Sequence, residues 1–162
     1  MGGMDISSRL EFEADPKTVY HMMTDQGWFE ELAASLDART RGIDVAGTTT
    51  RVQLAVDAPE QVRSFVGATL DMDQTVTWSE PAADGSRTAT MVIQVPGKPV
   101  SVNGNARLYP AGRGTVVEYT GELTVKVPFL GKKIEQQAAP HVKRAIDAQQ
   151  QAGDDWLAAR QS

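Results

Sequence analysis

Few side chains in this sequence combine a reactive group with apolar surroundings, and His141 is the first of them. It lies on the inward stripe of a predicted C-terminal helix, where an imidazole would serve as a polar handle or a general base in a pocket. A histidine on a helix face also forms ordinary hydrogen bonds to a neighbour or to water, and this second interpretation stays open. His141 is therefore a candidate catalytic residue, whereas His21 lies beside two methionines in a short helix. We expect no metal site, because two distant histidines without a cysteine are not a zinc ligand set.

Aromatic, thioether and amide side chains that are predicted to face inward form the second set. Tyr119 and Trp78 would give a pocket a flat apolar wall with a polar tip, or would simply fill core volume. Met72 and Met91 would line an adaptable apolar pocket, or would fill gaps in a core. Gln149 needs a hydrogen-bond partner if it is buried, and a ligand would provide one. Nucleophilic hydrolysis and phosphate binding have no support, because the sequence contains no elbow motif, no GxGxxG pattern and no P-loop.

The composition limits the classes of partner. The chain has 162 residues, of which 41% are hydrophobic and 23% charged, and we expect one globular domain over residues 1–162, with residues 1–4 disordered or added by cloning. The absence of cysteine excludes disulfides and thiol catalysis. A net charge of −5 argues against binding to nucleic acid or to an anionic membrane, since both need a clustered basic face. We expect a cytoplasmic protein without a cofactor and without integral membrane insertion, because no apolar run is long enough to span a bilayer.

The stretch from Phe129 to Arg160 is predicted to form a helix of roughly 45 Å. Its apolar face is bulky at both ends and mostly alanine in the middle, which indicates either a close approach to a sheet or empty space above the sheet. Pro140 removes a backbone donor, so we expect either one bent helix or two separate helices. At about 100° per residue, the inward face consists of Leu130, Ile134, Ala138, His141, Ala145, Ala148, Gln149, Ala152 and Trp156.

The preceding chain alternates between polar and apolar residues in a way that is typical of half-buried strands. Short turns between successive strands predict an antiparallel sheet that is apolar on one face, and Gly104 and Gly121 would permit sharp bends in it. The expected fold is α+β, with a curved antiparallel sheet of about seven strands wrapped around the long C-terminal helix. The expected elements are a strand at 5–13, short helices from Asp15-Pro16 and at 28–36, a hairpin at 41–56, a helical turn at 59–66, and strands at 68–80, 88–95, 100–109 and 115–127.

The stretch GKPVSVNGNARLYPAGRGTVVEYTGELTVKVPFLGKKIE and the helix end DDWLAAR resemble a known family. They are similar to an uncharacterised actinobacterial domain-of-unknown-function branch of the START-like superfamily, which includes birch-pollen-allergen-like proteins, polyketide cyclases and lipid-transfer domains. The resemblance extends from the first strand to Trp156-Leu157 and includes the step Pro128-Phe129-Leu130-Gly131 into the last helix. It implies a helix-grip fold with a hydrophobic cavity between the sheet and the long helix. It transfers no catalytic residue, because that branch carries no defined reaction.

Three functional hypotheses follow. The first is binding or transport of a hydrophobic or amphipathic small molecule, lipid-like or polyketide-like, in a cavity between the sheet and the C-terminal helix. The second is a polyketide cyclase or dehydratase type of enzyme, with His141 or a tyrosine as acid or base in the same pocket. The third is an interaction module with a filled core. The wall predicted for the pocket consists of Ile6, Leu10, Leu32, Met72, Trp78, Met91, Ile93, Leu108, Tyr119, Leu123, His141, Ala145 and Gln149.

Overall fold

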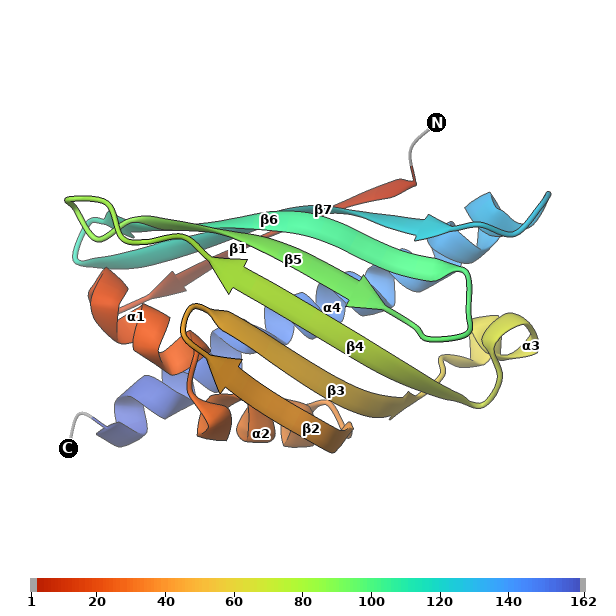
Figure 1. Cartoon of the computed structure of the whole chain (residues 1–162), viewed down its shortest axis with the longest axis horizontal. Coiled ribbons are helices and arrows are strands. Elements are labelled where there is room, and N and C mark those ends of the chain that lie inside the picture. Colours follow the sequence, from red (N-terminus) through yellow and green to blue (C-terminus); the bar gives the residue numbers. More distant parts are fainter. Residues whose placement is uncertain (1–2, 161–162) are drawn as a thin grey trace.

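The computed structural model describes residues 3–160, and within them seven strands and five helical segments follow the predicted order (Figure 1). The elements are β1 (Met4–Phe12), α1 (Pro16–Met23), α2 (Gln26–Ser35), β2 (Arg39–Ala46), β3 (Thr49–Asp57), η1 (Glu60–Val62), α3 (Arg63–Val66), β4 (Thr69–Trp78), β5 (Arg87–Gln94), β6 (Val100–Ala111), β7 (Gly114–Val125) and α4 (Gly131–Arg160).

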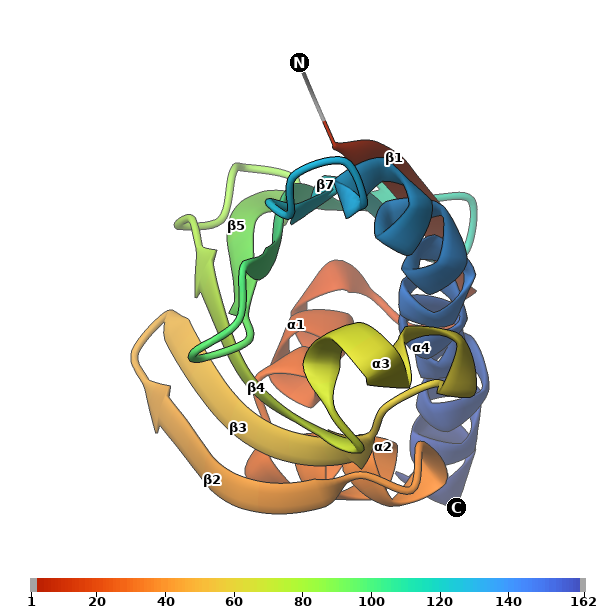
Figure 2. The ribbon, with the colours of Figure 1, turned by 90° about the vertical axis from the view of Figure 1, so that its right-hand side faces the viewer.

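All seven strands belong to one antiparallel sheet in the order β1-β7-β6-β5-β4-β3-β2. β1 and β2 are therefore the two edges, although they come first and second in the chain. Seen end-on, the sheet curves around an interior, and α4 lies across the gap between the two edges (Figure 2). The predicted α+β helix-grip fold, with two short helices after the first strand, is confirmed.

Two glycines face each other on neighbouring strands in the middle of the sheet. Gly104 of β6 pairs with Gly121 of β7. A Cβ on Gly104 would lie 2.6 Å from the carbonyl oxygen of Thr120, so the two backbones approach too closely for any larger residue. The glycine pair is thus a place where the sheet can bend inward without displacing a side chain.

The two short helices begin at carboxylate caps. The Asp15 carboxylate accepts a hydrogen bond from the Thr18 N–H at 2.8 Å, and Pro16 is the first helical residue, as predicted. Asp25 caps α2 in the same way, accepting from the Gly27 N–H at 2.7 Å. We expected the second short helix to begin at residue 28. That expectation is wrong, because the Asp25 cap starts α2 at Gln26 and places Gly27 in its first turn.

α4 is one uninterrupted helix that contains Pro140 at an exposed position. It begins at Gly131 rather than at Phe129, which has a positive φ of 65°. Its most buried face also differs from the predicted stripe, because Leu130 is exposed while other positions are covered by the sheet. The buried residues of α4 are Gly131, Ile134, Glu135, Ala139, Ile146, Gly153, Trp156 and Leu157.

Side-chain contacts with β1 and β7 set this rotation of α4. The Glu135 carboxylate accepts the Val125 N–H at 2.9 Å, which ties the start of the helix to the end of β7. At the other end, Gly153 lies directly against the ring of Phe12. The first strand already includes Met4, which pairs with Leu123. The disorder expected for residues 1–4 is therefore wrong for Met4, and residues 1–2 lie outside the described part.

Candidate functional site

The concave face of the sheet has two unlike halves along the strands. In the half next to α1, the inward side chains of Leu10, Leu108 and Val117 are buried. α1 closes this end, because the Tyr20 ring meets Trp78 edge-on, with centroids 5.7 Å apart. This half is an ordinary packed core.

In the half next to α3, the inward side chains on β3, β4 and β5 remain half-buried. Leu54 pairs with Met72, and Gln74 pairs with Ile93, so all of these side chains and that of Val76 lie on the concave face. Gln74 therefore lies on the same face of β4 as Met72. Side chains on the inside of a curved sheet are normally covered, and these retain accessible surface instead.

The long helix packs mainly on the β1 edge of the sheet. α4 packs on β1, β7, α2 and η1, at one side of the sheet. Ala138 and Val142 of α4 face the main core and are half-buried. We define the inner apolar surface as the half-buried residues Leu32, Ile43, Leu54, Met72, Val76, Ile93, Ala138 and Val142.

The pocket wall predicted from the sequence divides between these two environments. The structure buries Ile6, Leu10, Trp78, Met91, Leu108, Tyr119 and Leu123 in the main core cluster. It leaves Leu32, Met72, Ile93, His141, Ala145 and Gln149 half-buried. The first group is thus core packing, and the second group contains the predicted residues that keep accessible surface.

Two polar groups on the concave face have no hydrogen-bond partner among residues 3–160. The Thr50 hydroxyl is fully buried and unpaired. The Gln74 side chain is half-buried and is likewise without a side-chain hydrogen bond in that range. Thr50 pairs with Val76 and Gln74 with Val52, so both polar groups lie on neighbouring inward positions of β3 and β4. Buried polar groups normally form a hydrogen bond. The half-buried Gln74 amide can be reached by a further partner, whereas the Thr50 hydroxyl is enclosed.

Tyr119 joins the sheet to the helix through a hydrogen bond. Its hydroxyl donates to Oε1 of Gln149 at 3.0 Å. Burial raises the pKa of Tyr119 to about 12, so the phenol stays protonated near neutral pH and is unsuited to act as a base. The partner that we sought for Gln149 is therefore this tyrosine.

His141 has a cationic neighbour. Its Nδ1 lies 3.3 Å from Nη1 of Arg144, one turn further along α4, and the guanidinium donates in such a contact. Histidines that act in acid–base chemistry are commonly oriented by a carboxylate. The observed partner is an arginine, so this geometry gives no support to the catalytic hypothesis for His141.

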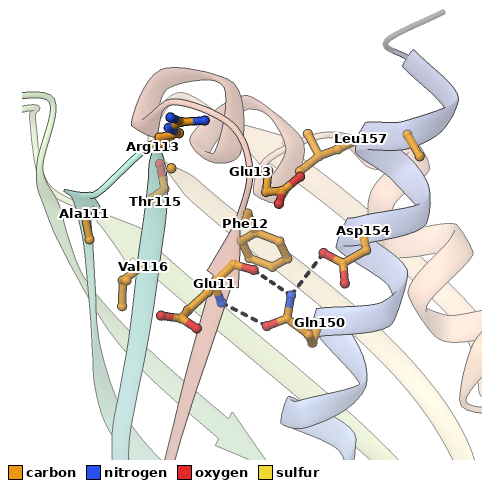
Figure 3. Close-up of a pocket in the computed structure, with 12 residues that line it drawn as sticks. Glu11, Phe12, Glu13, Ala111, Arg113, Thr115, Val116, Gln150, Asp154 and Leu157 are labelled. Carbon is orange, nitrogen blue, oxygen red and sulfur yellow. Dashed lines mark hydrogen bonds between the residues drawn. The ribbon is translucent and has the colours of Figure 1, made fainter.

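A groove of about 610 Å³ lies outside the sheet, between β1, the β6–β7 turn and the C-terminal part of α4 (Figure 3). Its lining is largely polar and includes Glu13 and Arg113. The Gln150 side chain bridges it, accepting the Glu11 N–H at 2.9 Å and donating to the Glu11 carbonyl at 2.7 Å, while also donating to Asp154 at 3.1 Å. Gln150 thus takes the place of a neighbouring strand at the free edge of β1. The groove contains none of the predicted wall residues.

Comparison with protein families gives one match, which covers residues 7–157 and is described as a protein of unknown function, DUF2505. The chain belongs to the DUF2505 family. No match is found among curated protein sequences.

Solved structures share the fold of this DUF2505 protein at low identity. TTHA0849 from Thermus thermophilus is 16% identical, with 98% of this chain and 100% of that chain covered and a TM-score of 0.67. A STAR-related lipid transfer protein from Xanthomonas axonopodis is 18% identical, with 93% and 84% covered and a TM-score of 0.63. The ZhuI aromatase/cyclase from Streptomyces sp. R1128 is 14% identical, with 93% and 90% covered and a TM-score of 0.58. The predicted resemblance to START-like helix-grip proteins is confirmed at the level of the fold.

The sequence reasoning missed part of the inner apolar surface of the DUF2505 chain. Val142 follows Ala138 by four residues and was left off the helix stripe, although this spacing places both on one side. Leu54 and Val76 were also omitted, although alternation puts them on the same face as Met72. The signal that separates them from the buried core, partial exposure on an inward face, is visible only in the structure.

Two further features bear on function. Residues 3–160 contain no group of three histidine, aspartate or glutamate side chains arranged to hold a metal ion. Among the helices in this range, none has the length and hydrophobicity needed to cross a bilayer.

Proposed function

We propose that this DUF2505 protein binds a hydrophobic or amphipathic small molecule, lipid-like or polyketide-like, between the concave face of the sheet and α4. The observation that carries the proposal is the inner apolar surface, where inward side chains of β3–β5 and α4 stay half-buried. A filled core would cover these residues as it covers Leu108 and Val117 near α1.

The energetics favour an apolar guest. Burying apolar surface is worth about 25 cal/mol per Å², so a guest that covers about 300 Å² gains roughly 7 kcal/mol before the cost of its lost motion. Gln74 would pair with the polar end of an amphipathic guest, because its half-buried side chain lacks a partner among the described residues. The proposed ligand therefore has an apolar body and at least one hydrogen-bonding group.

The names of the structural neighbours support this chemical class. One is called a lipid transfer protein and another an aromatase/cyclase, and both names refer to those proteins. At 18% and 14% identity they carry no residue assignment to this chain. The proposal does not extend to catalysis, because Tyr119 is held protonated and His141 is paired with Arg144.

The test is titration with a fluorescent fatty acid or a naphthalene-sulfonate dye. Val142→Trp adds bulk to the inner apolar surface, and we expect it to weaken binding by at least about tenfold. The matched control is Gln136→Trp, at an exposed position of the same helix, and it should leave the affinity unchanged. Equal affinities of both variants and the unmodified protein, with unchanged circular dichroism, would show that the dye does not bind there.

The identity of the natural ligand needs a separate measurement. Native mass spectrometry of the protein purified from its own host would detect a co-purifying molecule as a discrete mass increase. We expect the increase to disappear in Val142→Trp and to persist in Gln136→Trp.

A further inference from the structure

The segment between β7 and α4 exposes large apolar side chains. Phe129 is fully exposed, at 106%, and Leu130 is 40% exposed. Phe129 also has φ of 65°, a conformation that is uncommon for a bulky residue and costs conformational energy. A strained backbone that turns an aromatic ring to solvent is unfavourable in the isolated protein, so it suggests an apolar surface outside the molecule.

A second apolar side chain lies at the same end of the molecule. Phe65 of α3 is 36% exposed. α3, the β5–β6 turn and the β7–α4 segment all lie at the end of the molecule away from α1 (Figure 1), which faces the viewer in Figure 2. They are held there by a small core of Ala58, Val62, Val66, Val125 and Ile134. We call Phe65, Phe129 and Leu130 the apolar tip.

Lysines surround the apolar tip. Lys126, Lys132 and Lys133 flank Phe129 in the sequence, and Lys98 lies in the β5–β6 turn, whose Pro99 carbonyl accepts the Lys126 N–H at 2.9 Å. All four lysines are exposed, and within residues 3–160 none of them forms an ion pair. We call these four residues the lysine rim.

Nearby acidic groups leave much of this positive charge uncompensated. Asp57 and Asp71, at the ends of β3 and β4, pair with Arg39 at 3.7 Å and Arg41 at 3.0 Å. The Glu135 carboxylate is buried and accepts the Val125 N–H. Among residues 3–160, the remaining acidic groups toward this end are Glu60 of η1 and the paired positions Asp5 of β1 and Glu122 of β7, fewer than the lysines. A protein with a net charge of −5 thus has a basic end, and our inference from net charge against an anionic membrane missed this clustering.

We propose that the α3 end docks this protein onto the surface of an anionic lipid bilayer, with the apolar tip in the acyl–headgroup boundary and the lysine rim on the lipid phosphates. Exposed aromatic and aliphatic side chains ringed by lysines suit this interface, since it offers an apolar layer beneath a negatively charged one. The proposal goes beyond ligand binding and holds whether or not the inner apolar surface takes a guest.

The experiment is sedimentation of the full chain with vesicles of phosphatidylcholine, with and without about 30% phosphatidylglycerol. We expect binding to the anionic vesicles, reduced in 1 M salt, where the Debye length falls to about 3 Å. Phe129→Ser should lower the partition coefficient about tenfold. The double variant Lys132→Glu/Lys133→Glu should lower it at least about 20-fold.

Control variants lie on the opposite end and on another surface. Lys17→Glu changes an exposed lysine of α1, and Val45→Ser removes a 39% exposed side chain of β2. Both should bind vesicles like the unmodified protein. As a direct readout, the emission of Phe129→Trp should shift to the blue on anionic vesicles, over the background of the three native tryptophans.

Several outcomes would overturn the proposal. They are absence of binding to anionic vesicles, equal loss of binding in the control variants, or binding that Phe129→Ser leaves unchanged. Self-association that disappears in Phe129→Ser, without vesicle binding, would assign the tip to a second copy of the chain instead. Dye titration of Phe129→Ser separates the two proposals, because this exposed side chain lies outside the inner apolar surface and the dye affinity should not change.

Discussion

Replacing Gly153 by alanine tests how α4 sits on the sheet. Gly153 is buried in α4 against Phe12 of β1, which is 2% exposed. A Cβ at this position would overlap Cε1 of Phe12 and would lie 2.9 Å from its Cζ, closer than real Cβ contacts. The Phe12 ring is enclosed, so it cannot swing into solvent, and either the ring or the helix must shift.

The magnitude follows from two opposing terms. Alanine in a helix interior is favoured over glycine by about 1 kcal/mol. Overpacking a tight core costs about 1–3 kcal/mol, and overlap with an enclosed ring puts this site in the upper part of that range, at about 2–3 kcal/mol. We therefore expect Gly153→Ala to lower the free energy of unfolding by about 1–2 kcal/mol, or the melting temperature by about 2–8 °C.

Urea unfolding followed by tryptophan fluorescence measures this change. Gln136→Gly and Gln136→Ala, at an exposed position of α4, give the helix-propensity term on its own. The double variant Phe12→Leu/Gly153→Ala should recover part of the loss, because the smaller side chain makes room for the new methyl group. A Gly153→Ala protein that is as stable as the original, or more stable, would refute the close contact between α4 and β1.

Three further predictions concern ionisable or hydrogen-bonding groups. Glu135→Ala leaves the Val125 N–H unpaired and should cost about 1–3 kcal/mol in thermal unfolding, whereas a neutral result would exclude the buried hydrogen bond. Hydrogen bonds from Lys143 and Ser8 lower the pKa of Asp147. The stabilisation by this carboxylate is therefore present above the unfolded pKa near 4 and is lost as the pH falls through the folded pKa. Asp147→Asn should reduce the fall in the free energy of unfolding at acid pH, and an unchanged pH dependence would contradict this. Burial raises the pKa of Tyr119 to about 12. The contribution of the protonated phenol to the free energy of unfolding is therefore present below the unfolded pKa near 10 and is lost between about pH 10 and 12. Tyr119→Phe should remove this loss of stability at alkaline pH, and an ultraviolet titration in which every tyrosine ionises near pH 10 without unfolding would count against it.

Local patterns in the sequence carry most of the fold. Alternation in β1, the Asp15-Pro16 helix start and the Ala46-Gly47 turn, where Gly47 has φ of 61°, each act over a few residues. Antiparallel neighbours with short turns then define the sheet. Such signals can be read without knowing what lies across the core.

These local patterns could not predict how α4 is rotated about its own axis, or which inward residues stay partly exposed. Several positions around α4 are apolar, and contacts with β1 and β7 select Ala139 and Ile146 for the most buried face. Alternation says which face of a strand is inward but not whether that face is covered. Leu10 and Leu108 were therefore expected in a pocket wall, yet α1 closes that end and they are packed.

The Gln150 contact with Glu11 fixes the C-terminal half of α4 against the edge of the sheet. Lifting the C-terminal half of α4 would break both hydrogen bonds to the β1 backbone and separate Gly153 from Phe12. It would also expose unpaired backbone groups at the edge of β1, and exposed strand edges are prone to pairing with other chains. The C-terminal half of α4 is therefore anchored to β1, and a guest of the proposed kind is expected to enter without displacing it.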